Sequence, residues 1–419
     1  MIFNSHSLLY MKLEKYLEIR YIYILSIVNC ALMIYIFKVD VSFDSYTYID
    51  AWSTFQGGSI DKWRTPVYPM FLGITKFVCG DNYLWCVVFI QNLVYLVSIK
   101  YFFFLMQYSV ENKKISLAFT FFYALYPCVS TYNCCIVTES LAVSGAIFLL
   151  YSIVKLYTSK KTVFGFFPFF WLLFLIFLRP AVVYLLPVTM VWWCIIVIKR
   201  KGACDKPFIC GMVGTILVSI ILFVYIIMFK GSYGVFAPSG VGLINKYAIA
   251  KAANLIDLNA TKREQLLFYQ EAEKYINEMG MDNFSDLVSL SINQNKAKYA
   301  MRIIQNVRNA SEENLFEPSY LNGYIGVVSN IIGAKIKMLY FLFIFYFLFL
   351  LRWMIKHRDI PFFSCLLFMI GISNYIVIVI ASPGEYGRLS LPAIPVYLIM
   401  VGQLLRMIRM KTIAEVKFV

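Results

Sequence analysis

Four charged residues stand beside apolar stretches of the chain, where their side chains could take part in chemistry. Asp44 follows the first apolar stretch and Glu139 begins a later one, whereas Arg179 and Arg388 stand at the ends of two others. A carboxylate can take a proton from a reacting hydroxyl group. A guanidinium group can bind a phosphate through two parallel hydrogen bonds and neutralise its charge. These residues are far apart in the sequence, so the segments between them must fold to bring them together.

The elements that position these residues are expected to be membrane-spanning helices. Hydrophobic residues make up 61% of the 419 residues, and the mean hydropathy is +0.71. Such a composition is typical of a polytopic membrane protein and predicts an all-α integral membrane fold. We expect about ten spans, near 21–37, 84–107, 115–130, 137–157, 163–178, 181–198, 208–229, 336–352, 362–380 and 391–405.

The net charge of +15 does not indicate a nucleic-acid partner, because of where the basic residues lie. They cluster in the short connections between the expected spans, as at Lys113-Lys114 and Lys199-Arg200-Lys201. By the positive-inside rule, these connections and both termini are expected to be cytoplasmic. Residues 38–83 and 230–335 are then expected outside. The ten Cys and two His show no zinc spacing and no disulfide framework.

The expected spans divide the chain into three parts. Residues 1–229 form an N-terminal transmembrane module with the outward loop 38–83, and residues 336–419 form a C-terminal transmembrane module. Residues 230–335 between them are expected to form a helical cap. Thr261–Glu264 matches a capping box at the start of one cap helix. A second cap helix is expected from about 285 to 310.

The first outward loop combines a helix with acidic residues. Asp44 is expected to cap this helix, because its carboxylate can accept hydrogen bonds from the free N–H groups of the next turn. Tyr48 and Ala51 then fall on one apolar face, and Gly57-Gly58 is expected to end the helix. The prediction is an amphipathic helix on the membrane surface with a carboxylate at its start. The loop acids Asp50 and Asp61 are expected to be solvated charges.

The same loop carries a likeness to a known family. Its pattern F-D-S-Y-T-Y-I-D-A-W at 43–52, followed by G-G and by R-T-P-V-Y-P-M-F-L at 64–72, resembles the GT-C superfamily of membrane glycosyltransferases. The branch it looks most like contains the protein O-mannosyltransferases and the lipid A aminoarabinose transferases. Three later motifs agree, T-E-S-L-A at 138–142, L-R-P at 178–180 and E-Y-G-R-L-S-L-P-A-I-P at 385–395.

The resemblance implies an enzyme that moves a sugar from a polyprenyl-phosphate donor to a glycan, lipid or protein acceptor. The reaction is expected on the outer face of the membrane. A bacterial inner membrane is favoured, since no eukaryotic retention signal is present. Asp44 is implied as the catalytic base, and Glu139 as a second catalytic carboxylate that orients the acceptor or joins Asp44 at a metal. The donor phosphate is assigned to Arg388, Arg179 and Lys337, and substrate positioning to Tyr48, Arg64 and Tyr68.

The assigned carboxylates and the residues assigned to the donor phosphate could each have a purely structural role instead. Asp44 could be only a helix cap, Glu139 only a charge in a first helical turn, and Lys337 only an interface anchor. Arg179 and Arg388 could extend toward lipid headgroups. Many family members have two adjacent acids in the first loop, whereas Ser45 follows Asp44 here. No metal ligands are therefore assigned, and a divalent metal is left open.

Two other functions remain as alternatives. An O-antigen-type polymerase also handles polyprenyl-linked glycans, but would place its key arginines in large outward loops. A lipid-glycan flippase or other transporter would often show internal repeats and charges within its spans. The sequence shows neither internal repeats nor a pattern of charges within the expected spans.

Overall fold

The computed structural model describes residues 5–159, 161–199, 205–256, 265–313, 335–382, 384 and 386–416. Across these residues the secondary structure is helical, and the β pairing found there is an isolated bridge between Asp40 and Cys135. The expected all-α membrane fold is therefore confirmed.

Eight stretches of the described residues are long and apolar enough to cross a membrane. These stretches include all or most of the helices α1 (Ser5–Phe37), α4 (Tyr83–Val110), α7 (Glu139–Thr158), α9 (Leu185–Lys199), α10 (Lys206–Tyr233), α16 (Met338–His357), α17 (Phe362–Ala381) and α19 (Ile394–Val416).

The other two expected spans are shorter helices. The stretch expected at 115–130 consists of α5 (Lys113–Leu125) and α6 (Pro127–Thr131). Pro127 lacks an N–H group, and Tyr126 before it is extended, so α5 ends there. Its 13 residues span about 20 Å, less than the ~30 Å hydrocarbon core of a bilayer. The other short helix is α8 (Phe166–Leu178). The number of ten spans stays a prediction.

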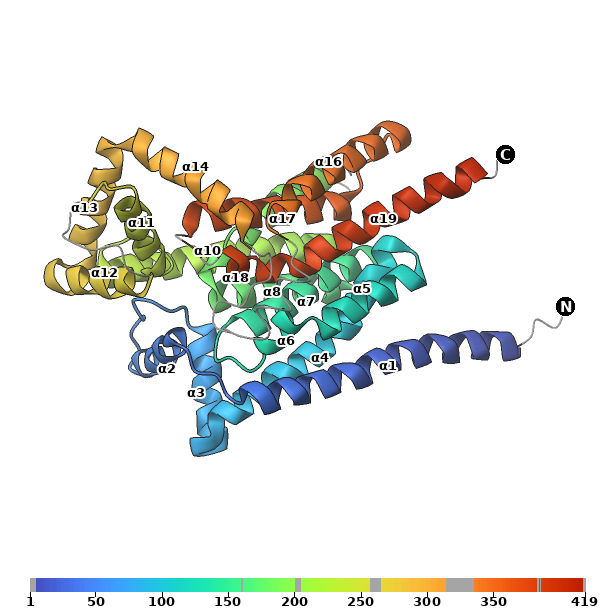
Figure 1. The fold of residues 1–419 in the computed structure, drawn as a ribbon, viewed down its shortest axis with the longest axis horizontal. Helices are drawn as coiled ribbons and strands as arrows, with labels where there is room; N and C mark the ends of the chain where they lie inside the picture. The colour runs from blue at the N-terminus through green and yellow to red at the C-terminus, as the bar shows by residue number, and fades with distance from the viewer. Residues whose placement is uncertain are drawn as a thin grey trace.

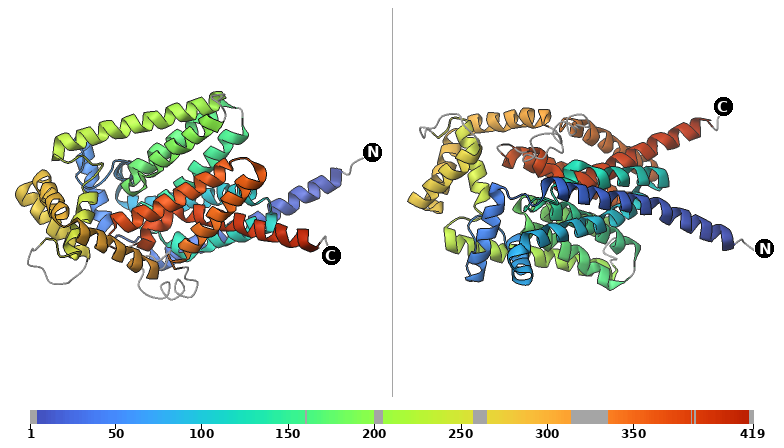
Figure 2. Two further views of the ribbon diagram at one scale, coloured as in Figure 1. Left: turned by 90° about the horizontal axis from the view of Figure 1, so that it is seen from above. Right: turned by 60° about the horizontal axis from the view of Figure 1, so that its bottom comes forward.

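The long helices run side by side, and the chain divides its remaining parts between the two ends of the bundle (Figure 1). The start of α1 and the end of α19 lie at one end. At the other end lie α2 (Phe43–Gln56), α3 (Val67–Cys79) and the helices of the segment between α10 and α16, as Figure 2 also shows. This separation is the one expected if 38–83 and 230–335 face the side opposite to both termini.

Helix α7 is the centre of the bundle and sets the position of Glu139. It is buried along nearly its whole length, in contact with α4, α8 and α19. Its close approach to α8 depends on Gly145, where a Cβ atom would lie 2.9 Å from Leu175 Cδ2. Glu139 is the first residue of this central helix.

The expectation that Asp44 caps α2 is wrong. The helix begins at Phe43, and the residue before it, Ser42, is the N-cap. Ser45 Oγ accepts a hydrogen bond from the Ser42 N–H at 2.9 Å, and the two hydroxyl groups are 3.2 Å apart. Because this serine pair completes the start of the helix, the Asp44 carboxylate is available for other partners. The helix ends at Gln56, before Gly57, as expected.

Of the described residues between α10 and α16, those at 234–256 and 265–313 are largely helical, as predicted. They contain α11 (Val241–Ala252), α12 (Gln265–Met279), α13 (Met281–Gln294) and α14 (Lys296–Glu312), which we call the cap. The single helix expected from 285 to 310 is instead two helices that meet at Asn295. The capping box at Thr261–Glu264 lies outside the described residues.

The cap and the first loop share a hydrophobic core of their own. Ile60 and Trp63 of the loop are buried with Phe229 at the end of α10 and with Tyr247 and Phe284 of the cap. The contact between the cap and the loop is therefore a packed apolar interface.

We predict that Ser53 and Ser289 face outward and that Lys114 faces the cytoplasm. All three are exposed. A cysteine at Ser53 or Ser289 should react in intact cells with an impermeant maleimide, whereas a cysteine at Lys114 should react only after permeabilisation. The unsubstituted chain, whose Cys194 is exposed, gives the background. The reverse labelling pattern would contradict the topology.

Candidate active site

Five charged side chains from separate parts of the chain form one connected series of ion pairs. Arg64 Nη2 lies 2.6 Å from Asp44 Oδ1, and Arg388 Nη2 lies 2.7 Å from Asp44 Oδ2. Arg388 also contacts Glu139 through its Nε, and Arg179 Nη1 lies 2.8 Å from Glu139 Oε1. The order is therefore Arg64, Asp44, Arg388, Glu139, Arg179, which we call the ion-pair series.

A short backbone pairing brings the two carboxylates together. The Asp40 N–H donates to Cys134 O at 3.0 Å, and the Ile136 N–H donates to Asp40 O at 3.0 Å. This isolated bridge joins the segment just before α2 to the segment just before α7. Asp44 lies a few residues after Asp40, and Glu139 lies a few residues after Cys135. The bridge between Asp40 and Cys135 therefore places both carboxylates at the same end of the bundle.

Arg64 is fixed along its whole guanidinium group. Nε donates to Thr47 Oγ1 at 2.7 Å and Nη1 donates to Tyr48 OH at 3.1 Å, while the group lies 4.1 Å from the centre of the Tyr48 ring. Its backbone is held by Asp61, whose Oδ1 accepts from the N–H groups of Trp63 and Arg64 at 2.8 and 2.7 Å. Asp61 is thus a turn-forming residue and not the solvated charge expected from the sequence.

Of the two tyrosines predicted to position substrate, Tyr48 contacts the Arg64 guanidinium group with its ring, and Tyr68 packs against Tyr48. Tyr48 is buried, and its ring makes an edge contact with the ring of Tyr68 at 5.0 Å. Tyr68 is fully buried, and its hydroxyl group donates to Gln91 Oε1 at 3.0 Å. Gln91 in turn donates to the backbone at Asn133 and Cys135, beside the Asp40 bridge. These contacts make the tyrosines a support for Arg64.

The arginines flanking Glu139 come from two breaks in helical structure. Arg179 follows α8 in an extended conformation, and Pro180 after it prevents the helix from continuing. Arg388 lies in the five-residue helix α18 (Tyr386–Ser390), between α17 and α19. Both side chains are largely buried, at 8% and 6% exposure, and Glu139 is wholly buried.

Asp44 is the most accessible member of the ion-pair series, with 22% of its side chain exposed. Burial alone would raise the pKa of this carboxyl group, but the charges of Arg64 and Arg388 outweigh that effect and hold the pKa below its ordinary value of 3.8. Asp44 is therefore ionised at neutral pH. The five side chains of the series are three guanidinium groups and two carboxylates, so together they carry one excess positive charge.

Lys337 is not brought to this series. It stands before α16, about half exposed, where its Nζ lies 3.5 Å from Glu312 Oε2. Thr47 and Asp61 were not predicted from the sequence as partners of Arg64, although Thr47 lies within the 43–52 pattern. The sequence does place Asp61 three residues before Arg64, a spacing that permits the observed turn.

The donor set does not fit a divalent metal ion. The oxygens of Asp44 and Glu139 are bound by three guanidinium groups, and the excess positive charge of the series would repel a cation. Across the described ranges, no group of three or more His, Cys, Asp or Glu side chains gathers as a metal site.

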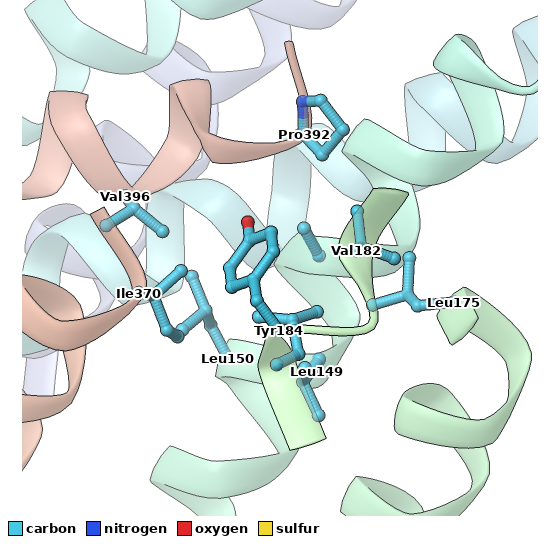
Figure 3. Close-up of a pocket in the computed structure, with 10 residues that line it drawn as sticks. Leu149, Leu150, Leu175, Val182, Tyr184, Ile370, Pro392 and Val396 are labelled. Carbon is cyan, nitrogen blue, oxygen red and sulfur yellow. The ribbon is translucent and has the colours of Figure 1, made fainter. Parts of the chain in front are cut away.

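A small apolar hollow lies beside the segments that carry Arg179 and Arg388 (Figure 3). Figure 3 shows the Tyr184 side chain within it, among side chains of the bundle. Its volume of about 10 Å³ is room for about one water molecule. It cannot hold a sugar or a lipid chain, so the ion-pair series is the stronger candidate for the site. The hollow is lined by Ala146, Leu149, Leu150, Leu175, Val182, Tyr184, Leu185, Ile370, Pro392 and Val396.

Comparison with known proteins supports the fold and not a narrower relationship. No family model and no curated protein matches the sequence. The structure matches that of the Archaeoglobus fulgidus oligosaccharyltransferase, solved with a tethered acceptor peptide that contains an NVT sequon, with a TM-score of 0.54 and 12% identity. The fold is similar to that of this membrane enzyme. The match covers 94% of this chain and 50% of the archaeal one, so this chain spans about half its length.

We predict that Glu139→Gln destabilises the protein by about 3–5 kcal/mol, because removing the buried negative charge leaves two buried guanidinium groups insufficiently paired. Thermal or denaturant unfolding in detergent measures the change. Glu312→Gln is the matched control: it removes a charge from an exposed ion pair with Lys337, and should cost less than about 1 kcal/mol. Equal effects would show that the ion-pair series is not a stabilising element.

Proposed function

We propose that this protein is a membrane glycosyltransferase of the GT-C type, which moves a sugar from a polyprenyl-phosphate donor to a glycan, lipid or protein acceptor. The observation that supports this most directly is the ion-pair series, in which an accessible carboxylate lies between guanidinium groups at one end of a membrane bundle. The fold shared with an oligosaccharyltransferase agrees with it. We place the reaction on the outer face of a bacterial inner membrane.

The arrangement provides both charges that sugar transfer from a phosphate requires. The acceptor hydroxyl oxygen forms a bond to the anomeric carbon, and the bond from that carbon to the phosphate oxygen breaks. The hydroxyl proton passes to Asp44. The phosphate that leaves carries the negative charge, which Arg388 and Arg179 stabilise. Arg64 keeps Asp44 in place through the contacts that fix its own guanidinium group.

The same contacts explain how Asp44 can become more basic when the donor binds. With Arg64 and Arg388 both on its oxygens, Asp44 is a weak base, since these charges stabilise its ionised form. A donor phosphate competes with the carboxylate for the Arg388 fork. If Arg388 turns to the phosphate, Asp44 loses one of the two charges that lower its pKa. Its affinity for the acceptor proton then rises in the presence of the donor.

We propose that the acceptor reaches Asp44 on the side where the first outward loop, residues 38–83 (loop 1), packs against the cap at Ile60 and Trp63. A protein acceptor is one option among the three, as the archaeal structure holds an acceptor peptide. Glu139 is wholly buried and fully engaged with arginines, so its proposed part is to orient Arg388 and Arg179.

We predict that Asp44→Asn lowers the rate of sugar transfer about 10²–10⁴-fold, because the amide cannot take the proton. The assay is transfer of labelled sugar from a polyprenyl-phosphate donor in membranes. Asp50→Asn, on the exposed face of the same helix, is the control and should keep full activity. The Asn amide nitrogen would face a guanidinium group, so unfolding of both variants is measured as well. Full transfer by Asp44→Asn would exclude the proposed base.

The pH dependence supplies a related test. Because the pKa of Asp44 lies below 3.8 when paired, this group stays ionised as the pH falls to about 4, and it contributes stability that is lost only below that range. Donor affinity should therefore show no change attributable to Asp44 between pH 7 and pH 5. Protonation of Asp44 would release Arg388 to the donor phosphate, so a donor affinity that rises tenfold in that interval in the native protein, and not in Asp44→Asn, would contradict the pairing.

We predict that Arg388→Lys raises the donor concentration needed for half-maximal transfer at least about tenfold. Lysine keeps the charge but cannot bridge Asp44, Glu139 and a phosphate with a planar fork. Donor titration in membranes measures this. Arg352→Lys, at an exposed position in the last part of α16, is the control. An unchanged donor requirement would return Arg388 to a purely structural part.

A further inference from the structure

Arg64 and Arg388, whose guanidinium groups hold Asp44, each lie next to a chain segment that contacts the cap or its ends. The two segments contact different parts of the cap. Arg64 follows residues 60–63, which contact α10, α11 and α12. Arg388 lies in the first turn of α18, which contacts Glu313 at the end of α14. The cap is thus connected to the two sides of the same carboxylate, although no cap residue belongs to the ion-pair series.

On the Arg64 side, the contacts include two hydrogen bonds to backbone carbonyl groups, a close approach to an aromatic ring and an ion pair. Tyr233 OH donates to Ile60 O at 2.6 Å, and the Gly240 N–H donates to Lys62 O at 2.8 Å. A Cβ atom at Gly240 would lie 2.6 Å from the Trp63 ring. The Lys62 side chain also lies 3.3 Å from Glu273 of α12. Trp63 directly precedes Arg64, so the contact between Gly240 and the Trp63 ring helps to fix the position of the Arg64 side chain.

On the Arg388 side, the contacts described come from Glu313 and Asn306, at and near the end of α14. Glu313 Oε2 accepts hydrogen bonds from the N–H groups of Tyr386 and Gly387, at 3.0 and 3.4 Å. A little earlier in α14, Asn306 Nδ2 donates to Ser382 O at 3.3 Å. The end of α14 therefore holds the chain on both sides of residue 384, just before Arg388.

A helix as short as α18 cannot fix its own start. Its first N–H groups have no partner within the helix, and five residues form too few hydrogen bonds to offset the cost of nucleation. Glu313 provides the missing acceptor for two of these groups, and its negative charge suits a helix N-terminus. Arg388 is the next residue after Gly387, so a shift of this first turn moves its guanidinium group relative to Asp44 and Glu139.

We propose that the cap positions the two arginines on Asp44, with Glu313 as the positioning residue for Arg388 and the contact of Gly240 with Trp63 as its counterpart for Arg64. Glu313 acts through Arg388 and does not itself contact substrate. The proposal rests on the proposed function for its effect on sugar transfer. The geometric part, that Glu313 and Arg388 are coupled, is independent of any activity.

The first test compares Glu313 with its neighbour Glu312. Glu313→Ala should lower kcat/KM for the donor about 10²-fold, the size expected when a catalytic geometry shifts by about 1 Å. Glu313→Gln keeps an oxygen that can accept both N–H groups, and should restore most of this loss. Glu312→Ala removes an exposed charge paired with Lys337 and should have no effect. Equal activity of Glu313→Ala and the native protein would overturn the proposal.

The second test separates positioning from general stability. In an Arg388→Lys background, Glu313→Ala should cause little further loss of kcat/KM, because the fork that Glu313 positions is already absent. Full additivity of the two losses would overturn the proposal. If Glu313→Ala does not accumulate in membranes, Glu313→Asp takes its place, since it keeps the charge but shortens the side chain by one methylene.

The Arg64 side has a matched pair of glycines. Gly240→Ala should force Trp63 to move and lower kcat/KM, whereas at Gly242, two residues further on, an added Cβ meets no atom within 4 Å and Gly242→Ala should be silent. A silent Gly240→Ala would overturn this half of the proposal.

Failure of the proposed function would be recognised separately. If the native protein transfers no sugar from any polyprenyl-phosphate donor, the same Glu313→Ala and Arg388→Lys cycle is measured on the unfolding temperature in detergent. Shifts that are clearly non-additive support the coupling of the two residues, and additive shifts overturn it.

Discussion

The burial of Glu139 is the constraint on which the rest of the site depends. An isolated carboxylate in a protein interior within a membrane is very costly, and it is tolerated only with charged partners at hydrogen-bond distance. Glu139 begins the most buried helix of the bundle, and Arg179 and Arg388 supply those partners. Because these arginines come from α8 and α18, the burial of one carboxylate requires two distant breaks in helical structure to meet at the start of α7.

The rest of the ion-pair series follows from the same requirement. Arg388 contacts Glu139 through its Nε atom, and its Nη2 atom is left to contact Asp44. The Asp40 bridge to Cys135 fixes loop 1 beside the start of α7, which makes this contact possible. Arg64 then closes the series from within loop 1. The exposed oxygen surface of Asp44 is the point where this otherwise buried series meets the outside.

Local patterns in the sequence were sufficient for the helices but not for the pairing of charges. Hydropathy identified the long spans, and Gly57 marked the end of α2, since both depend on neighbouring residues. The cap of α2 was assigned to Asp44 because an acid is a good N-cap, but Ser42 and Ser45 satisfy that end reciprocally. A carboxylate that is attracted by two guanidinium groups gains more from them than from a neighbouring N–H group.

The errors elsewhere have similar causes. The break at Asn295 divides a stretch that is amphipathic throughout, so periodicity alone could not locate it. Lys337 stands at the end of a span like Arg179, yet it pairs with Glu312. Sequence position gives the depth of a charged residue in the membrane, whereas its partners depend on which helices are neighbours. The five members of the ion-pair series were each noticed in the sequence, but their order could come only from the fold.

The distribution of these residues along the chain has a consequence for charge. Four of the five, Arg64, Asp44, Glu139 and Arg179, lie before α9, and their charges cancel. Arg388 comes from α18, after α17, and it supplies the single excess positive charge of the series. It also joins the two carboxylates, which have no other guanidinium in common among the pairs described. Without Arg388, the other four members of the series would therefore be neutral together. Under the proposed function, the attraction of the series for an anionic phosphate depends on the position of α18, whose first turn is held by Glu313 at the end of α14.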